Sequence, residues 1–368
     1  MSARTTGRPL RAGVVGLGWA GQQHMAAYAQ LPGVELVALA GQEPEQLATL
    51  AQTYGVADTF DDAEAMLATA ELDVVSLATP TALHAPMSIK ALDAGVHVLC
   101  EKPMAENAAR AREMVAAATA NDRVLDVTFN KRRGREVTAL HQLATDGLLG
   151  RIYYVKCGWL RRTGIPGLGS WFTQQAMAGG GPMMDIGVHV LDMALHVMGE
   201  PEVHAVTGAT YAEFGPRGLG GSPGTAGNKW VPEGGGSTKF EVEDLGTAFV
   251  RMTDGATLLV EASWAQYVPR DLMYLTVYGT KGGANLELPT GPGSTPHLSV
   301  VTDVDGIPAE LSPILGPEGG HADCVATFVD TVGSGNWDAH RGRVGLKRTA
   351  IIDACYASAA SRSEVVLD

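Results

Sequence analysis

Short apolar runs alternate with stretches of helical periodicity along the first third of the chain. The apolar runs are nearly continuous, while the segments 19–31, 81–94 and 107–120 repeat their apolar positions at helical spacing. This alternation is typical of a parallel sheet with helices on both faces. We therefore predict a doubly wound α/β domain over residues 1–129. Its expected strands are 12–15, 34–40, 74–78, 96–100 and 124–128.

The pattern changes after Asn130, where a helical stretch over 135–146 precedes segments in which apolar and polar residues alternate. Asp254-Gly255 lies between two of these segments, and an Asp-Gly pair is a strong hairpin signal. Such strands with segregated helices indicate an α+β domain with an open, mainly antiparallel sheet, which we place at 130–368. The strands are expected at 152–159, 203–211, 239–252, 257–264 and 272–279, and further helices around 183–198 and 318–332.

Three glycines follow the first apolar run in the spacing of a dinucleotide fingerprint, and a helix is expected directly after them. Gly16 would make the tight turn, Gly18 would let the backbone approach a pyrophosphate, and Gly21 would let the helix pack on the strand. The helix start at Trp19 and Ala20 would add N–H donors for the phosphates. The alternative is an ordinary glycine-rich turn, but strand, turn and helix fall in register, which favours a dinucleotide.

A second short motif, Glu101-Lys102-Pro103, follows the fourth apolar run. Ligands bind at the carboxyl ends of parallel strands, so Lys102 is placed to donate a hydrogen bond to a substrate oxygen. Glu101 could pair with this lysine, and Pro103 would restrict the turn. The alternative is a surface ion pair. Cys100 ends the expected strand and is predicted to be a buried, inert thiol.

A glycine-rich turn, residues 179–182, opens the expected helix over 183–198. The histidine and carboxylate nearest the turn, His189 and Asp185, suit acid/base chemistry on a substrate that the glycines could admit. A metal site is the weaker alternative, because no cysteine ligand or second histidine motif completes it. The residues further along the helix, Asp192 and His196, also fit a solvent-exposed helix face or buried histidines that hydrogen-bond the backbone. Four titratable residues share one helical face: Asp185, His189, Asp192 and His196.

The formal net charge of −13 argues against a general nucleic-acid or anionic-membrane surface. No apolar stretch approaches the length of a membrane span, and residues 1–11 lack the apolar segment of a signal peptide. The four cysteines show neither a C-x-x-C pair nor metal-ligand spacing, so a reducing cytoplasm is expected. The Gly/Pro/Ser-rich segment 215–237, with Trp230 near its centre, is predicted to cover the substrate mouth or a neighbouring subunit.

Together these motifs resemble the Gfo/Idh/MocA family of NAD(P)-dependent sugar oxidoreductases, over nearly the whole chain. The resemblance rests on the glycine fingerprint, the Glu101-Lys102-Pro103 run and the pattern G-G-x-x-x-D-x-G-x-H that ends at His189. It implies that Lys102 hydrogen-bonds the reacting oxygen near the nicotinamide, that His189 is the general acid/base, and that Asp185 is its partner. It also covers a turn expected at the cofactor: Thr79, Pro80 and His84.

The end of the second expected strand bears on the choice between NAD and NADP. Many family members carry an acid there for the adenosine ribose, whereas this chain has Gly41. Glycine would leave room for a 2′-phosphate, yet no Arg or Lys follows to neutralise it. Gln42 and Glu43 come next, and Glu43 could bind the ribose hydroxyls instead. Both cofactors therefore stay open at this point, with NAD favoured.

The resemblance implies a cytoplasmic enzyme that interconverts a secondary alcohol and a ketone on a sugar, cyclitol or sugar derivative by hydride transfer. Two alternatives remain: a redox-neutral, NAD-dependent glycosidase, and a non-catalytic dinucleotide sensor, which the intact Lys102, Asp185 and His189 disfavour. Neither a metal nor a nucleic-acid or membrane partner is expected. A wide sheet with few helices to cover both faces predicts a homodimer or homotetramer.

Overall fold

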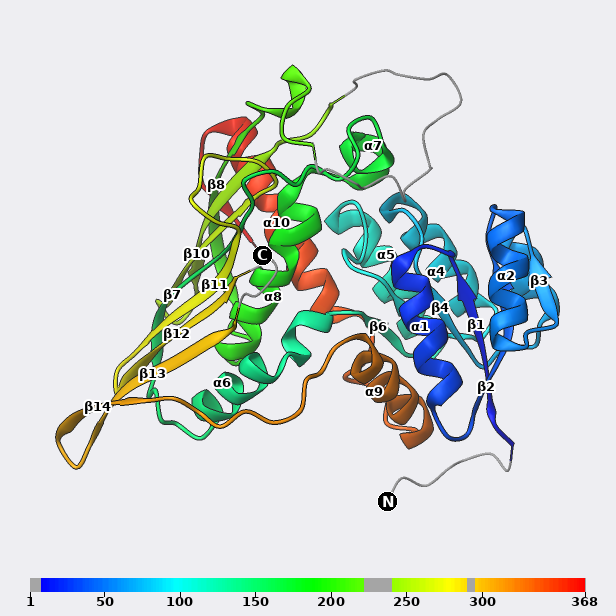
Figure 1. The fold of residues 1–368 in the computed structure, drawn as a ribbon, viewed down its shortest axis with the longest axis horizontal. Helices are drawn as coiled ribbons and strands as arrows, with labels where there is room; N and C mark the ends of the chain where they lie inside the picture. The colour runs from blue at the N-terminus through cyan, green and yellow to red at the C-terminus, as the bar shows by residue number, and fades with distance from the viewer. Residues whose placement is uncertain (1–7, 222–239, 290–294, 368) are drawn as a thin grey trace. The chain divides into compact units, whose positions relative to one another are not determined.

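The chain divides into two compact units in the computed structural model (Figure 1). The first unit comprises Met1–Asn130 and Gly319–Thr349, and the second comprises Lys131–Glu318 and Ala350–Asp368. No helix among the described residues has the length and apolar character needed to cross a bilayer. The described residues are 8–221, 240–289 and 295–367.

A six-stranded parallel sheet forms the centre of the first unit, in the order β3-β2-β1-β4-β5-β6. Its apolar strands are buried on both faces, which confirms the predicted doubly wound domain. The strand order reverses between β1 and β4, and ligands bind such sheets at the carboxyl ends beside that point. The strands are β1 (Leu10–Val15), β2 (Val34–Ala40), β3 (Asp58–Phe60), β4 (Val74–Leu77), β5 (His97–Cys100) and β6 (Leu125–Val127). The helices between them are α1 (Trp19–Gln30), α2 (Pro44–Tyr54), α3 (Ala63–Thr69), α4 (His84–Asp93) and α5 (Ala108–Ala120).

Helix α9 (His321–Ser334) belongs to the first unit, although we expected a helix at 318–332 to cover the second sheet. Its apolar residues Val325 and Phe328 are buried in one cluster with Met25 and Tyr28 of α1. The sequence shows that this helix has an apolar face but not which sheet it covers. The predicted division at 129/130 also omits this return of the chain.

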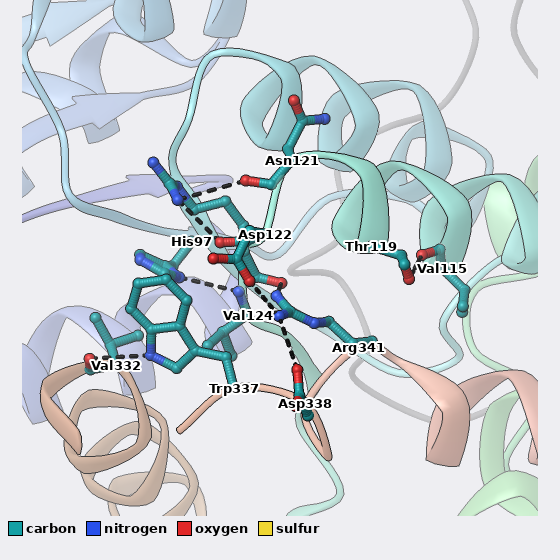
Figure 2. A network of polar contacts seen from close by, with 11 residues as sticks. His97, Val115, Thr119, Asn121, Asp122, Val124, Val332, Trp337, Asp338 and Arg341 are labelled. Carbon is teal, nitrogen blue, oxygen red and sulfur yellow. Dashed lines mark hydrogen bonds and ion pairs between the residues drawn. The ribbon is translucent and has the colours of Figure 1, made fainter. Parts of the chain in front are cut away.

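The segment after α9 attaches to the edge of the first sheet through the polar network in Figure 2. Trp337 packs edge-on against His97 at 4.5 Å between ring centroids, and its Nε1 donates to the carbonyl of Val332. The amide of Val124 donates to His97 Nδ1 at 2.9 Å. Arg341 donates to the carbonyl of Arg123 at 2.7 Å. These contacts hold the returning segment beside β6.

The second unit contains a nine-stranded sheet in the order β14-β13-β12-β11-β7-β10-β9-β8-β15. Its neighbours are antiparallel except for β7 and β10, as expected for an open, mainly antiparallel sheet. Asp254-Gly255 joins β9 to β10, which confirms the predicted hairpin. The strands are β7 (Ile152–Leu160), β8 (Val203–Tyr211), β9 (Leu245–Met252), β10 (Thr257–Ser263), β11 (Leu272–Gly279), β12 (Gly282–Pro289), β13 (His297–Val304), β14 (Ile307–Leu311) and β15 (Val365–Val366).

Helices cover one face of this sheet (Figure 1). The predicted helix over 183–198 consists of a π-helical segment, Met183–Gly187, followed by α8 (Val188–Val197), which packs on β7, β10 and β11. The second half of α10 (Arg343–Ser361) packs on β8 and β9, where Ser358 accepts a hydrogen bond from the amide of Gly208. This unit also contains α6 (Arg135–Thr145) and the short helix α7 (Gln175–Ala178).

Candidate active site

The fingerprint glycines occupy three different environments in the turn between β1 and α1. Gly16 has a φ of +100°, and a Cβ there would lie 2.2 Å from the carbonyl oxygen of Ala78. A Cβ at Gly21 would lie 2.0 Å from the carbonyl oxygen of Gly16, so no larger residue fits between helix and strand. A Cβ at Gly18 would meet nothing within 4 Å. The turn is therefore tight at its ends and open at its middle.

The open middle of the turn is also the start of α1. Gly18 precedes the helix, and the N–H groups of Trp19 and Ala20 lie in its first turn, where an α-helix has no internal acceptor for them. Trp19 is 68% exposed. These residues fit the pyrophosphate of a dinucleotide, because they combine an open approach, free donors and the positive end of a helix dipole.

The structure corrects the expected space beside Gly41. A Cβ at this position would lie 2.4 Å from Cγ of Leu17, so the buried leucine fills the space that we had left for a 2′-phosphate. Gln42 and Glu43 follow as exposed residues, and Glu43 precedes the first residue of α2. No Lys or Arg occurs from Gly41 to the end of α2. This environment favours a ribose hydroxyl over a phosphate.

Glu101 is buried at the carboxyl end of β5 and bonds to groups from distant parts of the first unit. Its Oε1 lies 3.0 Å from Nε2 of His24 in α1 and 3.6 Å from Nε2 of His321 in α9. Its Oε2 accepts the backbone N–H of Lys102 at 3.2 Å. The expected partner was the side chain of Lys102. Sequence reasoning missed both histidines, because neither lies near the motif along the chain.

Lys102 is half-buried, and the turn that carries it is tied to the turn after β4. Buried His84 places Nδ1 2.8 Å from the carbonyl oxygen of Pro103 and Nε2 2.9 Å from that of Thr79. Burial lowers the pKa of His84. Since both ring nitrogens face backbone carbonyls, His84 can support a cofactor only through the turns that it joins. Thr79 and Pro80 themselves are half-buried in one of those turns.

All four cysteines are buried free thiols, including Cys100 at the end of β5. Burial raises the pKa of Cys100 far above its ordinary value, so the thiolate is not formed at neutral pH. This confirms the prediction of an inert thiol beside the Glu101-Lys102 motif.

In the second unit, the glycine-rich turn before Asp185 is packed against two side chains that the sequence analysis did not identify. A Cβ at Gly180 would lie 2.1 Å from the hydroxyl of Tyr356, and a Cβ at Gly181 would lie 2.1 Å from the carbonyl oxygen of Glu243. These glycines therefore admit neighbouring protein groups, which corrects the expectation that they make room for substrate.

Glu243 binds the backbone of this turn. Its carboxylate accepts N–H groups from Gly181 at 2.9 Å and Met183 at 3.1 Å, and the hydroxyl of Tyr356 at 2.9 Å. Burial raises the pKa of Glu243, although these donors oppose the shift. The contact fixes the entry to the π-helical segment that carries Asp185.

Asp185 lies within the π-helical segment and accepts a hydrogen bond from Nε1 of Trp264 at 2.9 Å. Trp264 is fully buried, and its backbone N–H donates to the carbonyl of Asp244 at 3.0 Å. Residues 243–244 therefore hold both the backbone before Asp185 and the indole that binds its carboxylate. π-Helical turns occur frequently at functional sites.

His189 follows in the first turn of α8 and is 6% exposed. Its ring lies 5.8 Å from that of Trp159 on β7, measured between centroids. Arg161 lies over the same indole, with Cζ 4.8 Å from the ring centroid.

The remaining polar residues of the helix have structural contacts. Asp192 is buried and accepts a hydrogen bond from Arg132 Nε at 2.8 Å. His196 stacks on His141 at 3.8 Å between centroids, and burial lowers its pKa to about 4. Within the part of the chain that the structure describes, no group of three His, Cys, Asp or Glu residues could hold a metal ion. Trp230 and most of the segment 215–237 lie outside the described residues.

Comparison with known proteins supports this architecture. Residues 10–129 match an oxidoreductase family with an NAD-binding Rossmann fold, and residues 137–285 match the GFO/IDH/MocA C-terminal domain. The chain is 35% identical to D-glucoside 3-dehydrogenase of Escherichia coli (strain K12) over 288 residues, 78% of this chain and 79% of that protein. It is 30% identical to levoglucosan dehydrogenase of Pseudarthrobacter phenanthrenivorans over 286 residues, 74% and 72% of the two chains.

Solved structures agree over nearly the full length. Levoglucosan dehydrogenase in complex with NADH and levoglucosan gives a TM-score of 0.80 at 25% identity, covering 98% of this chain and 99% of that chain. Aldose-aldose oxidoreductase from Caulobacter crescentus, complexed with glycerol, gives 0.79 at 26% identity, covering 98% and 100%. With its NAD-binding Rossmann domain and its matching C-terminal domain, the chain belongs to the Gfo/Idh/MocA oxidoreductase family.

Proposed function

We propose that this protein catalyses the NAD-dependent interconversion of a secondary alcohol and a ketone on a sugar, cyclitol or sugar derivative. The observation that carries the proposal is the arrangement of Asp185 and His189, in which a carboxylate fixed by Trp264 directly precedes the turn of a buried histidine. The sugar class is supported by relatives named D-glucoside 3-dehydrogenase and levoglucosan dehydrogenase.

Each proposed catalytic residue handles the proton or the charge on the reacting oxygen. When bound, NAD supplies the hydride acceptor. His189 removes the alcohol proton as the C–H bond breaks, and it returns that proton in the reverse direction. Lys102 donates a hydrogen bond to the oxygen and stabilises its developing negative charge. Asp185 orients His189 and the substrate hydroxyls.

NAD binding is assigned to residues at the carboxyl edge of the first sheet. The turn at Gly16, Gly18 and Gly21 and the start of α1 would hold the pyrophosphate. Glu43 would bind the adenosine ribose. Gly41 would contribute indirectly, because its missing side chain leaves the space that Leu17 occupies. Glu101 and Lys102 would lie on the nicotinamide side of the strand reversal, supported by the turn that contains Thr79 and Pro80.

A substrate panel tests this function directly. Methyl glucosides, levoglucosan, free aldoses and inositols are each incubated with NAD or NADP, and formation of the reduced cofactor is followed. Net NADH formation with at least one of them is expected. Release of an aglycone without net NADH would instead indicate the redox-neutral glycosidase cycle.

We further propose a homodimer or homotetramer formed through the helix-free face of the second sheet. Along β7, β10 and β11 most of the residues that point away from α8 are half-buried, while most of those between them are buried. Two of the former, Tyr154 and Tyr278, stack at 5.5 Å between ring centroids, and Lys156 lies over Tyr278. An aromatic-rich sheet face with charges interspersed suits a protein interface. The four reduced thiols also fit the expected cytoplasmic location.

A further inference from the structure

The buried carboxylate of Glu101 lies where the nicotinamide half of a dinucleotide binds in this type of sheet. Glu101 directly follows β5, and its backbone N–H donates to the carbonyl of Leu77 at the end of β4 at 2.8 Å. In the sheet, β4 and β5 lie on one side of the strand reversal and β2 lies on the other. The end of β2 is the expected binding site of the adenosine ribose. Glu101 is 6% exposed, and acids are buried to this extent almost only where they have partners.

One chain of hydrogen bonds reaches Glu101 from α1. The hydroxyl of Tyr28 lies 2.9 Å from Oγ of Ser76, which lies 2.8 Å from Nδ1 of His24. Tyr28 can donate to Ser76, and Ser76 to Nδ1 of His24. The Nε2–H group of His24 then donates a hydrogen bond to Oε1 of Glu101 at 3.0 Å. In this arrangement every member of the chain has a hydrogen-bond partner.

A second set of donors reaches the carboxylate from the other side. The side-chain amide of Asn130 lies 3.2 Å from Nδ1 of His321, which directs the Nε2 proton of that histidine toward Glu101. The edge of the His321 ring system also meets Trp19 at 5.0 Å between centroids, next to the fingerprint turn. The backbone N–H of Lys102 completes the set.

These donors keep the carboxylate ionised. Burial by itself would raise the pKa of Glu101, but the hydrogen bonds from His24 and His321 outweigh it and hold this pKa well below its ordinary value. The ionised carboxylate therefore places a negative charge in a region shielded from water. Such a charge acts on nearby groups more strongly than a surface charge does.

We propose that the Glu101 carboxylate, held by His24 and His321, makes this protein bind NAD⁺ in preference to NADH. The two cofactor forms differ in the charge of the nicotinamide, which is positive only in NAD⁺. A fixed anion beside this half of the site stabilises the oxidised form and leaves the reduced form nearly unaffected. The inference rests on the NAD-binding domain and does not require the sugar reaction to be correct.

The test compares cofactor affinities of the full-length protein without any sugar. Dissociation constants for NAD⁺ and NADH are measured by calorimetry for the wild type, Glu101→Gln and Glu101→Asp. The glutamine keeps the shape and removes the charge, so its ratio of Kd(NAD⁺) to Kd(NADH) should rise roughly tenfold. The aspartate keeps the charge, so its ratio should stay within about threefold of wild type.

Asp73→Asn provides a matched control. Asp73 is likewise a carboxylate with side-chain donors, here from Arg8, but it precedes β4 at the amino edge of the same sheet, away from the ligand edge. Its ratio should equal that of the wild type. A Glu101→Gln protein that weakens both cofactor forms equally, or that binds neither form, would show a structural role and overturn the proposal. An unchanged ratio would overturn it as well.

Discussion

At the scale of single residues, His189 is the side chain whose loss should reduce turnover most. General acid–base groups contribute about 10²–10⁴-fold, so His189→Ala should lower kcat by that range while leaving the Kd for NAD close to wild type. His196→Asn is the matched control, because His196 lies on the same helix and stacks on His141. Steady-state kinetics and NAD titration provide the two readouts. A His189→Ala enzyme with near-wild-type kcat would remove this residue from the proposed role.

Glu43 provides a residue-scale test of cofactor choice. If its carboxylate binds the ribose hydroxyls, Glu43→Ala should lower kcat/KM for NAD about tenfold and change that for NADP little, since a ribose-binding acid repels a 2′-phosphate. Glu45→Ala, one position into α2, serves as the control because it removes the same charge nearby. If kcat/KM for NAD divided by kcat/KM for NADP is the same in the two variants, the ribose is bound by other residues.

His97 makes the stability of the protein depend on pH. Burial lowers the pKa of His97 to about 4, while the unfolded chain binds this proton near pH 6.5. Between these values the unfolded state binds more protons, so the free energy of unfolding should rise with pH by up to about 1.4 kcal/mol per pH unit. His97→Asn retains an acceptor for the amide of Val124 but does not titrate. Urea unfolding at pH 5 and pH 7 should show a smaller pH difference for this variant; an equal difference would contradict the assignment.

Candidate site residues could be proposed from the sequence where they lie close together along the chain. The fingerprint glycines, Glu101-Lys102 and the Asp185–His189 pair all appear as short motifs. The groups that hold them do not, because Glu243, Trp264 and Tyr356 bond to residues 60 to 113 positions away. Sequence motifs do not link residues so far apart, because these residues meet only when the sheet and its helices have packed.

At the scale of elements, the brace on the π-helical segment should stabilise both the fold and the site. Glu243→Ala leaves two backbone N–H groups without their acceptor, which costs about 1–3 kcal/mol for each buried group. Tyr356→Phe removes one donor and leaves those two bonds in place, so its loss should be about 1 kcal/mol. Urea unfolding measures both changes. A Glu243→Ala protein as stable as Tyr356→Phe would contradict the role of the carboxylate as an anchor.

Five strands of the first unit were predicted because buried parallel strands form nearly continuous apolar runs, whereas the three-residue β3, whose first two positions are exposed, was not. Strands β12 to β14 were not predicted, since their exposed positions and the glycines at the start of β12 weaken the alternation. The expected strand at 239–252 begins only at Leu245 in the structure, and Lys239 lies outside the described residues. The π-helical segment was missed because helical periodicity does not reveal a single wider turn.

At the scale of the whole molecule, the helix-free sheet face predicts self-association. Sedimentation at micromolar concentration should give two or four times the chain mass of 38.4 kDa. Tyr278→Glu would place a charge at the stacked pair on this face and should shift the species toward the monomer. Tyr267→Glu, at an exposed tyrosine outside the strands, is the control. A wild-type protein that sediments as a single chain would contradict the assembly.

In the proposed reaction, NAD oxidises a sugar hydroxyl and His189 removes the hydroxyl proton. The most direct measurement is the formation of NADH on mixing the protein with NAD and the panel of glucosides, anhydrosugars and cyclitols, for the wild type and His189→Ala side by side. We predict stoichiometric NADH and ketone with at least one member for the wild type, and a loss of about 10²–10⁴-fold in rate for the variant. Absence of NADH across the whole panel from a protein that binds NAD, or equal rates for the two proteins, would contradict it.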